Sequence, residues 1–183
     1  MKQFAVFLML SVIALSSVAA ADQRDARLGE LFSRLHRSED IREIAHLQAY
    51  IWSIWSEGAD KKSSAWMYDG LLALRGKRFN IALQRFDELV NYDPDFAEGW
   101  NKRATVLYFL GRFEESIADI QKVLVLEKRH FGALSGLGLC YEALGDEEAA
   151  LEAYQRALQM NPHLQFLPGK IERLRKNIRR RNI

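Results

Sequence analysis

Apolar residues recur along the chain at helical spacing, and the pattern itself repeats every 34 residues, which aligns segments 63–96, 97–130 and 131–164. Each slot of the repeat keeps the size of its side chain. Large apolar residues stand at the fourth and twenty-fourth positions, and small residues stand at the eighth and twentieth. The fourth-position residues are Trp66, Trp100 and Leu134; the small ones are Gly70, Ala104, Gly138, Ala82, Ser116 and Ala150; and the twenty-fourth-position residues are Phe86, Ile120 and Tyr154.

This pattern predicts one helical hairpin per repeat. Small residues at the eighth and twentieth positions let the two helices of a hairpin approach closely. Gly111 and Gly145 occupy the same slot between the helices, and Gly76 lies one residue early. Pro94 and Pro162 follow the second helix, which they cannot extend. We therefore predict an all-α fold.

The repeat resembles the tetratricopeptide repeat, which has the same period and the signature W-x2-L-G-x2-Y followed by A-x3-F and P. The third segment, LSGLGLCYEALGDEEAALEAYQRALQMNP, is close to the family pattern. The departures are Asp69 and Arg103 in place of leucine and Lys128 in place of proline. The resemblance implies a right-handed superhelical stack of three helical hairpins with a concave binding groove.

The resemblance also implies that positions two, five, nine, twelve and thirteen of each first helix line this groove. The surface is mixed and mostly apolar, and it suits an extended segment or a helix of a partner protein. Packing against neighbouring helices is an equal alternative for the leucines. Chaperone-binding members clamp a C-terminal carboxylate with Lys and Asn, which Met67 and Leu71 do not match. The predicted groove residues are Met67, Leu71, Leu74, Arg75, Glu98, Asn101, Thr105, Tyr108, Phe109, Ser135, Leu139 and Glu142.

Helical segments are predicted on both sides of the repeats. Residues 22–62 are helical but out of register, with one helix over 25–36 and a second that Ser38 caps and Gly58 ends. We expect this hairpin to cap the first repeat, since an uncovered terminal repeat leaves its apolar face in water. Residues 165–183 form a basic closing helix that Pro168 opens.

The first 21 residues read as a secretory signal peptide. Lys2 precedes an apolar run from Phe4 to Leu15, and cleavage is expected near Ala20 or Ala21. The run is shorter than the roughly 20 residues that a membrane span needs. The chain is most similar to small exported, periplasmic tetratricopeptide proteins of Gram-negative, alphaproteobacteria-like bacteria. That resemblance implies an envelope scaffold that supports envelope integrity or, in a pathogen, virulence.

The net charge of +2 is unevenly distributed, because seven of the 26 basic residues lie near the C-terminus. Contact of this tail with anionic lipid or lipopolysaccharide is an alternative function. A solvated helix end is the simpler reading. Nucleic acid is not an expected partner, because no aromatic residue is interleaved with the tail arginines. The basic residues are Lys170, Arg173, Arg175, Lys176, Arg179, Arg180 and Arg181.

Catalytic and metal-binding patterns are not found in the sequence. The four histidines lack metal-ligand spacing, and the single cysteine, Cys140, cannot form a thiolate zinc site. Neither a phosphate-binding glycine loop nor a nucleophile elbow occurs. We expect no metal, no cofactor and no enzymatic activity.

Arg103 stands at an inward position of its helix, where the repeat normally has leucine. Asp69 occupies the same slot one repeat earlier, which predicts a buried ion pair between neighbouring first helices. Contact of Arg103 with Asp119, or with solvent, is an equal alternative.

Overall fold

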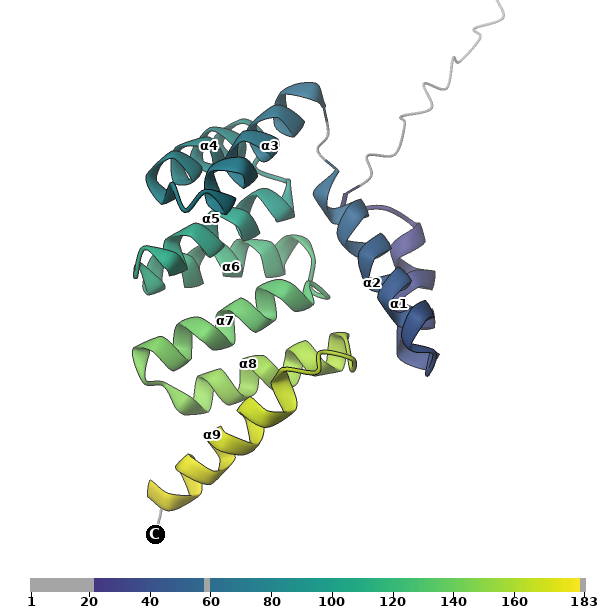
Figure 1. The fold of residues 1–183 in the computed structure, drawn as a ribbon, viewed down its shortest axis with the longest axis vertical. Helices are drawn as coiled ribbons and strands as arrows, with labels where there is room; N and C mark the ends of the chain where they lie inside the picture. The colour runs from purple at the N-terminus through teal and green to yellow at the C-terminus, as the bar shows by residue number, and fades with distance from the viewer. Residues whose placement is uncertain (1–21, 58–59, 182–183) are drawn as a thin grey trace, which may run out of the picture.

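The computed structural model describes residues 22–57 and 60–181, and within them the chain forms nine helices and no strand (Figure 1). The predicted signal peptide lies outside the described residues. The helices are α1 (Arg27–Arg37), α2 (Ile41–Ser56), α3 (Lys61–Arg75), α4 (Phe79–Tyr92), α5 (Ala97–Phe109), α6 (Phe113–Leu126), α7 (Phe131–Leu144), α8 (Glu147–Met160) and α9 (Leu167–Arg181).

Helices α3 to α8 form three hairpins that stack in chain order, and α9 packs on α8 (Figure 1). The predicted all-α stack of helical hairpins is confirmed. The small slots explain the close pairing within each hairpin: a Cβ atom on Gly70 would lie 2.6 Å from the ring of Phe86. A Cβ atom on Gly138 would likewise overlap the ring of Tyr154.

Each turn between the two helices of a hairpin contains one residue in the left-handed backbone conformation, and in two of the three hairpins this residue is glycine. Gly111 and Gly145 have φ angles of 74° and 81°. In the first hairpin Gly76 lies one residue too early, so Lys77 adopts a φ of 56° instead. An L-residue with a side chain is strained in this region.

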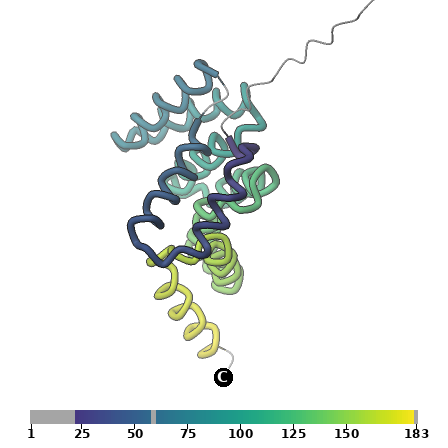
Figure 2. Tube along the Cα trace, turned by 90° about the vertical axis from the view of Figure 1, so that its right-hand side faces the viewer, coloured from purple at the N-terminus to yellow at the C-terminus, as the bar shows by residue number. Residues whose placement is uncertain are grey.

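The N-terminal hairpin of α1 and α2 does not cap the first repeat as predicted. It lies beside the stack, where Leu35, Trp55 and Phe131 share one hydrophobic cluster (Figures 1 and 2). The ring of His163 also bonds the carbonyl of Leu35 at 2.8 Å. The predicted cap residue is wrong as well, because Asp40 rather than Ser38 accepts the first backbone N–H groups of α2.

Arg103 is bound by the second helices of the hairpins and not by Asp69. Its Nε and Nη2 atoms each donate to Asp119 at 2.7 Å, and Nη1 donates to Asp87 at 2.9 Å. Asp69 is exposed on α3. The predicted pair fails because α5 packs mainly on α4 and α6, whose carboxylates are therefore nearer. The alternative partner Asp119 is confirmed.

Candidate partner-binding groove

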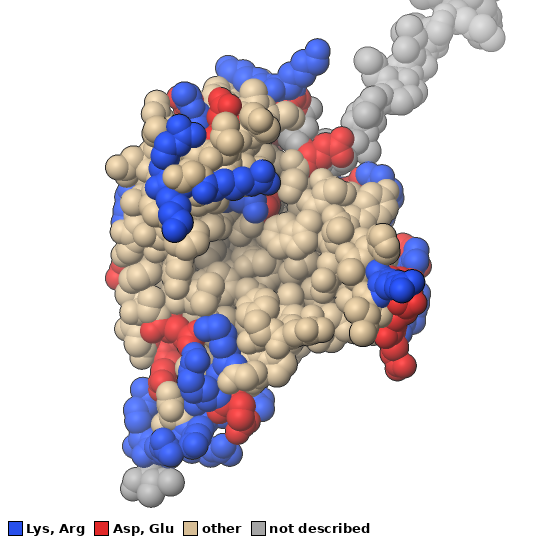
Figure 3. Space-filling model, viewed as in Figure 1, with Lys and Arg blue, Asp and Glu red and all other residues tan. Residues whose placement is uncertain are grey.

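A small cavity lies on the concave side of the stack between α5 and α7. Its volume is about 120 Å³. None of the residues that line it is charged. Figure 3 shows a hollowed surface near the middle of the molecule with no charged side chain at its centre. Five predicted groove residues line the cavity together with small and apolar neighbours on α5, α6 and α7. They are Asn101, Thr105, Tyr108, Phe109 and Leu139, and the neighbours are Ala104, Ser116, Ile120, Gly132 and Gly136.

The open end of this groove has an aromatic rim. Phe109 is 55% exposed and stacks on Phe79 with ring centroids 5.4 Å apart. The ring of Tyr108 contacts both Phe109 and Phe113. Because these rings hold one another in place, they offer apolar contact area at little cost in side-chain entropy.

Several predicted groove residues are wholly or partly buried in the packing of the helices. Met67 belongs to the core of the first hairpin, and Leu71 and Leu74 pack against the same core. Ser135 is buried and donates its hydroxyl to the carbonyl of Phe131. Arg75 is exposed at the end of α3. The packing alternative therefore holds for the first repeat, and the groove prediction is wrong for Met67 and Ser135.

Glu142 anchors the last helix and is not part of the open groove. Its carboxylate receives Lys170 Nζ at 2.7 Å, the guanidinium of Arg173 and the hydroxyl of Tyr154. Burial opposes the charged form of Glu142, but Lys170 and Tyr154 lower its pKa. The sequence missed this role because α9 lies outside the repeat.

Glu98 is also buried, in a polar cluster of α5 and α7 that helix α2 of the N-terminal hairpin covers. Its Oε2 atom accepts from Asn101 Nδ2 at 2.8 Å and lies 2.9 Å from His130 Nε2. Lys102 Nζ lies 2.7 Å from Oε1. The His130 ring stacks on Trp55 with centroids 4.1 Å apart. The polar half of the groove is thus covered by α2.

The hydrogen bonds fix the state of this cluster. His130 Nδ1 accepts the backbone N–H of Ala133 at 3.0 Å, so Nε2 carries the proton that it donates to Glu98. Burial opposes the charged form of Glu98, but Lys102 and His130 lower its pKa to about 2. Glu98 is therefore ionised and fully occupied by its own chain at neutral pH.

Sequence reasoning missed His130 and the tryptophans of α2. His130 occupies the last slot of the second repeat, where no groove contact is expected. One signal was present: Gly132 stands at a groove position, and a Cβ atom there would lie 2.5 Å from the Trp52 ring. A glycine at that slot indicates that another element approaches the backbone closely.

The basic helix α9 uses much of its charge within the molecule. Lys170 and Arg173 pair with Glu142, and Arg181 pairs with α8. Arg179 pairs with Glu172 on the same helix. Within the described part of the chain, the basic residues of α9 that carry no ion pair are Arg175, Lys176 and Arg180.

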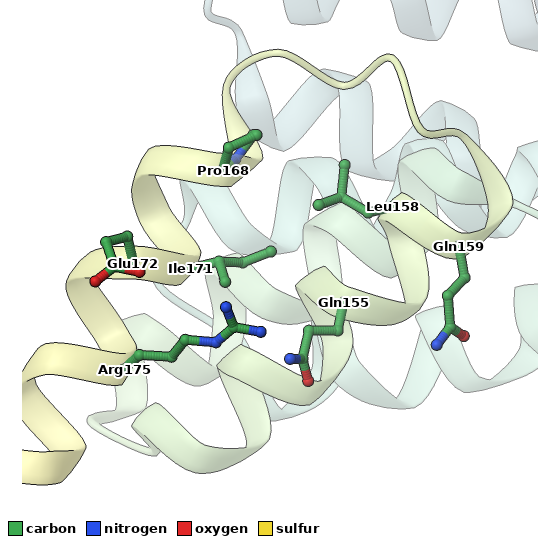
Figure 4. A pocket seen from close by; sticks show the side chains of 7 residues that line it. All are labelled: Gln155, Leu158, Gln159, Pro168, Ile171, Glu172 and Arg175. Carbon is green, nitrogen blue, oxygen red and sulfur yellow. The ribbon is translucent and has the colours of Figure 1, made fainter.

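A cleft of about 660 Å³ separates α8 from α9 (Figure 4). Arg175 extends from α9 toward Gln155 on α8 across this cleft. By the repeat register, α9 is equivalent to the first helix of a fourth hairpin, and the second helix of that hairpin would pack in this cleft. Close pairing of the two helices needs a small residue at the eighth position, such as Gly70 and Gly138 in their hairpins. In α9 this position is Glu172, which is too large for such pairing. Within the described residues, α9 is the last helix of the stack.

Other chemistry is not apparent in the described residues. Over residues 22–57 and 60–181, His, Cys, Asp and Glu form no group of three that could hold a metal ion. No helix in this part of the chain is long and apolar enough to cross a membrane. Cys140 is buried, and burial raises the pKa of its thiol, which disfavours the reactive thiolate.

Comparisons with known proteins agree with the geometry. A tetratricopeptide repeat family model matches residues 67–125 and 101–164. A TPR repeat-containing protein of Rhizobium etli is 34% identical over 143 residues, which cover 78% of this chain and 70% of that protein. DnaJ homolog subfamily C member 7 of Mus musculus is 28% identical over 57% of this chain and 21% of its own length.

Solved structures show the same fold. The first TPR of Spaghetti (RPAP3) bound to the HSP90 peptide SRMEEVD aligns with a TM-score of 0.63 at 19% identity, covering 64% of this chain and 94% of that one. MamA aligns with a TM-score of 0.61 at 18% identity, covering 76% of this chain and 85% of that one. Folds of this kind are typical of protein interaction scaffolds that bind peptides.

Proposed function

Because the chain belongs to the tetratricopeptide repeat family, we propose that it is an exported scaffold of the bacterial cell envelope that binds an apolar segment of a partner protein. The binding surface is the open half of the concave groove, formed by Thr105, Tyr108, Phe109 and Leu139. A role in envelope integrity or virulence would act through that partner.

The uncharged, aromatic-rimmed cavity between α5 and α7 is the observation that supports this proposal. It has room for an apolar side chain but no cation to pair with an acidic peptide end. The partner segment is therefore apolar, unlike the SRMEEVD peptide in the RPAP3 complex. Contact of α9 with anionic lipid is less well supported, because Lys170, Arg173 and Arg181 already pair with carboxylates on α7 and α8.

A crosslinking pull-down from periplasmic extract tests the groove. Leu139→Glu places a charge in the cavity, and Val125→Glu is the matched control at an exposed apolar residue of α6. We expect Leu139→Glu to lose a partner that the wild-type protein and Val125→Glu both retain. Identical recovery by all three baits would refute groove binding. A variant with Arg175, Lys176 and Arg180 changed to Gln tests the lipid alternative, and we expect it to retain the same partner.

Two further measurements test location and ligand class. Mass spectrometry of the protein from a periplasmic fraction should give an N-terminus after Ala20 or Ala21, and recovery of the uncleaved chain from the cytoplasm would contradict export. Fluorescein-labelled SRMEEVD should show no saturable rise in anisotropy. Binding that Leu139→Glu abolishes would contradict the proposed apolar specificity.

A further inference from the structure

The N-terminal end of the stack presents an apolar helix face, and two of its three positions, those of Ala65 and Leu72, are buried in the other repeats. Tyr68 on α3 is 68% exposed and Leu72 is 50% exposed. Ala65 is exposed too, and the three residues lie at i, i+3 and i+7, on one side of the helix. We call Ala65, Tyr68 and Leu72 the end face. Figures 1 and 2 both place α3 and α4 at the end of the stack.

The two internal repeats show what covers the positions of Ala65 and Leu72. Gly99 and Val106 are the α5 equivalents of Ala65 and Leu72. A Cβ atom on Gly99 would lie 3.3 Å from Leu89 of α4. Val106 is fully buried in one cluster with Leu89. In the second repeat, therefore, this face is covered by the second helix of the preceding hairpin.

The third repeat repeats the arrangement. Ala133 and Cys140 on α7 are the equivalents, and both are fully buried in one cluster with Ile120 and Val123 of α6. In both repeats, small or medium apolar residues of the first helix pack against apolar residues of the second helix of the preceding hairpin. The end face has matching chemistry, and the hairpin that precedes it in the chain docks elsewhere, against α5 and α7.

Charge identifies the kind of helix that fits. The two ends of α3 expose three basic residues, Lys61, Lys62 and Arg75, whereas the middle of the helix exposes one acidic residue, Asp69. The helices that cover the internal repeats are acidic on balance: α6 carries three acidic residues and one lysine. An acidic amphipathic helix would match both the apolar face and its basic ends.

A second copy of the chain does not supply such a helix. Across the described residues, each second helix already carries a first-type helix on its outer side: α5 on α4, α7 on α6 and α9 on α8. Head-to-tail contact would also place the basic α9 against the basic ends of α3. Like charges disfavour that arrangement.

We infer that the end face of α3 is a second interaction surface, which receives an acidic amphipathic helix of another protein in the way that α7 receives α6. The surface is distinct from the concave groove, because its residues point away from the next hairpin and not into the cavity between α5 and α7. A partner bound here lengthens the stack by one helix.

The helix α6 itself is the probe. A fluorescein-labelled peptide of residues 113–126, stapled on its exposed side, is titrated with the purified protein and followed by fluorescence anisotropy. Leu72→Glu places a charge in the centre of the end face, and we expect it to weaken binding by at least about tenfold. Val125→Glu is the control, because Val125 is 77% exposed and lies on α6, away from the end face. It should change affinity by less than about twofold.

Four results would overturn the inference: no binding of the stapled peptide, equal binding of a scrambled stapled peptide, equal effects of Leu72→Glu and Val125→Glu, or a dimer in sedimentation that Leu72→Glu converts to monomer. The last would show that a second copy covers the face. Leu139→Glu should leave this peptide's affinity unchanged, which separates the end face from the groove. Thermal melts of every variant confirm that the fold is intact.

Discussion

Replacing Glu98 with Gln tests whether the buried cluster fixes the N-terminal hairpin to the stack. The pKa of Glu98 is about 2 against an ordinary value of 4.5. A difference of that size corresponds to about 3 kcal/mol of stability. Because the pKa in the folded state is lowered, this contribution is present above about pH 4.5 and is lost as the pH falls toward 2.

Gln retains the acceptor for His130 and the shape of the side chain, so the substitution removes mainly the charge. We expect Glu98→Gln to lower the free energy of unfolding by about 3 kcal/mol at pH 7. The difference from wild type should fall to about 1 kcal/mol by about pH 2.5. Urea titrations between pH 7 and 2.5 measure it, and the stacking of Trp55 on His130 makes tryptophan fluorescence a local probe.

Other carboxylates also titrate in this range, so the test is the difference between the two proteins and not either curve alone. A difference that is constant over the whole pH range would refute the proposed role of the charge. Glu114→Gln is the control, because Glu114 is exposed on α6. It should leave the pH dependence close to that of the wild type.

Four further substitutions test the packing of the stack. Gly138→Ala should lower the free energy of unfolding by about 1 to 3 kcal/mol in urea titrations, because the new Cβ atom overlaps the buried ring of Tyr154. Gly136→Ala should raise it by up to about 1 kcal/mol, because the new Cβ atom makes only an ordinary contact at 3.5 Å and alanine favours the helix. Arg103→Leu should lower the free energy of unfolding by about 3 kcal/mol, because it leaves the buried carboxylate of Asp119 unpaired. A double-mutant cycle with Asp119→Leu that shows no coupling energy would contradict the ion pair. Lys77→Gly should raise stability by about 1 kcal/mol, since it relieves a φ of 56°, and an unchanged urea midpoint would count against that strain.

The repeat made the stack predictable from sequence, because a hairpin contacts mainly its neighbours. Small residues such as Gly70 and Gly138 specify the helix pairing, and Gly145 specifies a turn, so local signals determine the fold. The same logic failed for Arg103. Register indicates which residues are equivalent, but it does not indicate which carboxylate lies nearest to a side chain.

The site was predicted only in part, because an element outside the repeat covers half of the groove. Thr105, Tyr108, Phe109 and Leu139 lie together as expected. Glu98 does not, because His130 and Lys102 bind its carboxylate and α2 covers His130. The hairpin 22–57 shares no register with the repeats, so its own pattern did not indicate which face it would pack against, and Gly132 was the one signal on the side of the repeats.

The docked hairpin determines where on the concave face a partner can bind. A segment that crosses the whole face would have to displace Trp52 from its contact with Gly132 and remove the stacking of Trp55 on His130. The free energy of those contacts would be subtracted from its affinity, since a ligand that requires a minor conformation binds more weakly by the fraction of molecules in that state. A segment confined to the aromatic rim around Tyr108 and Phe109 bears no such penalty. The fold therefore favours short apolar segments at the open end of the groove over extended peptides that span it.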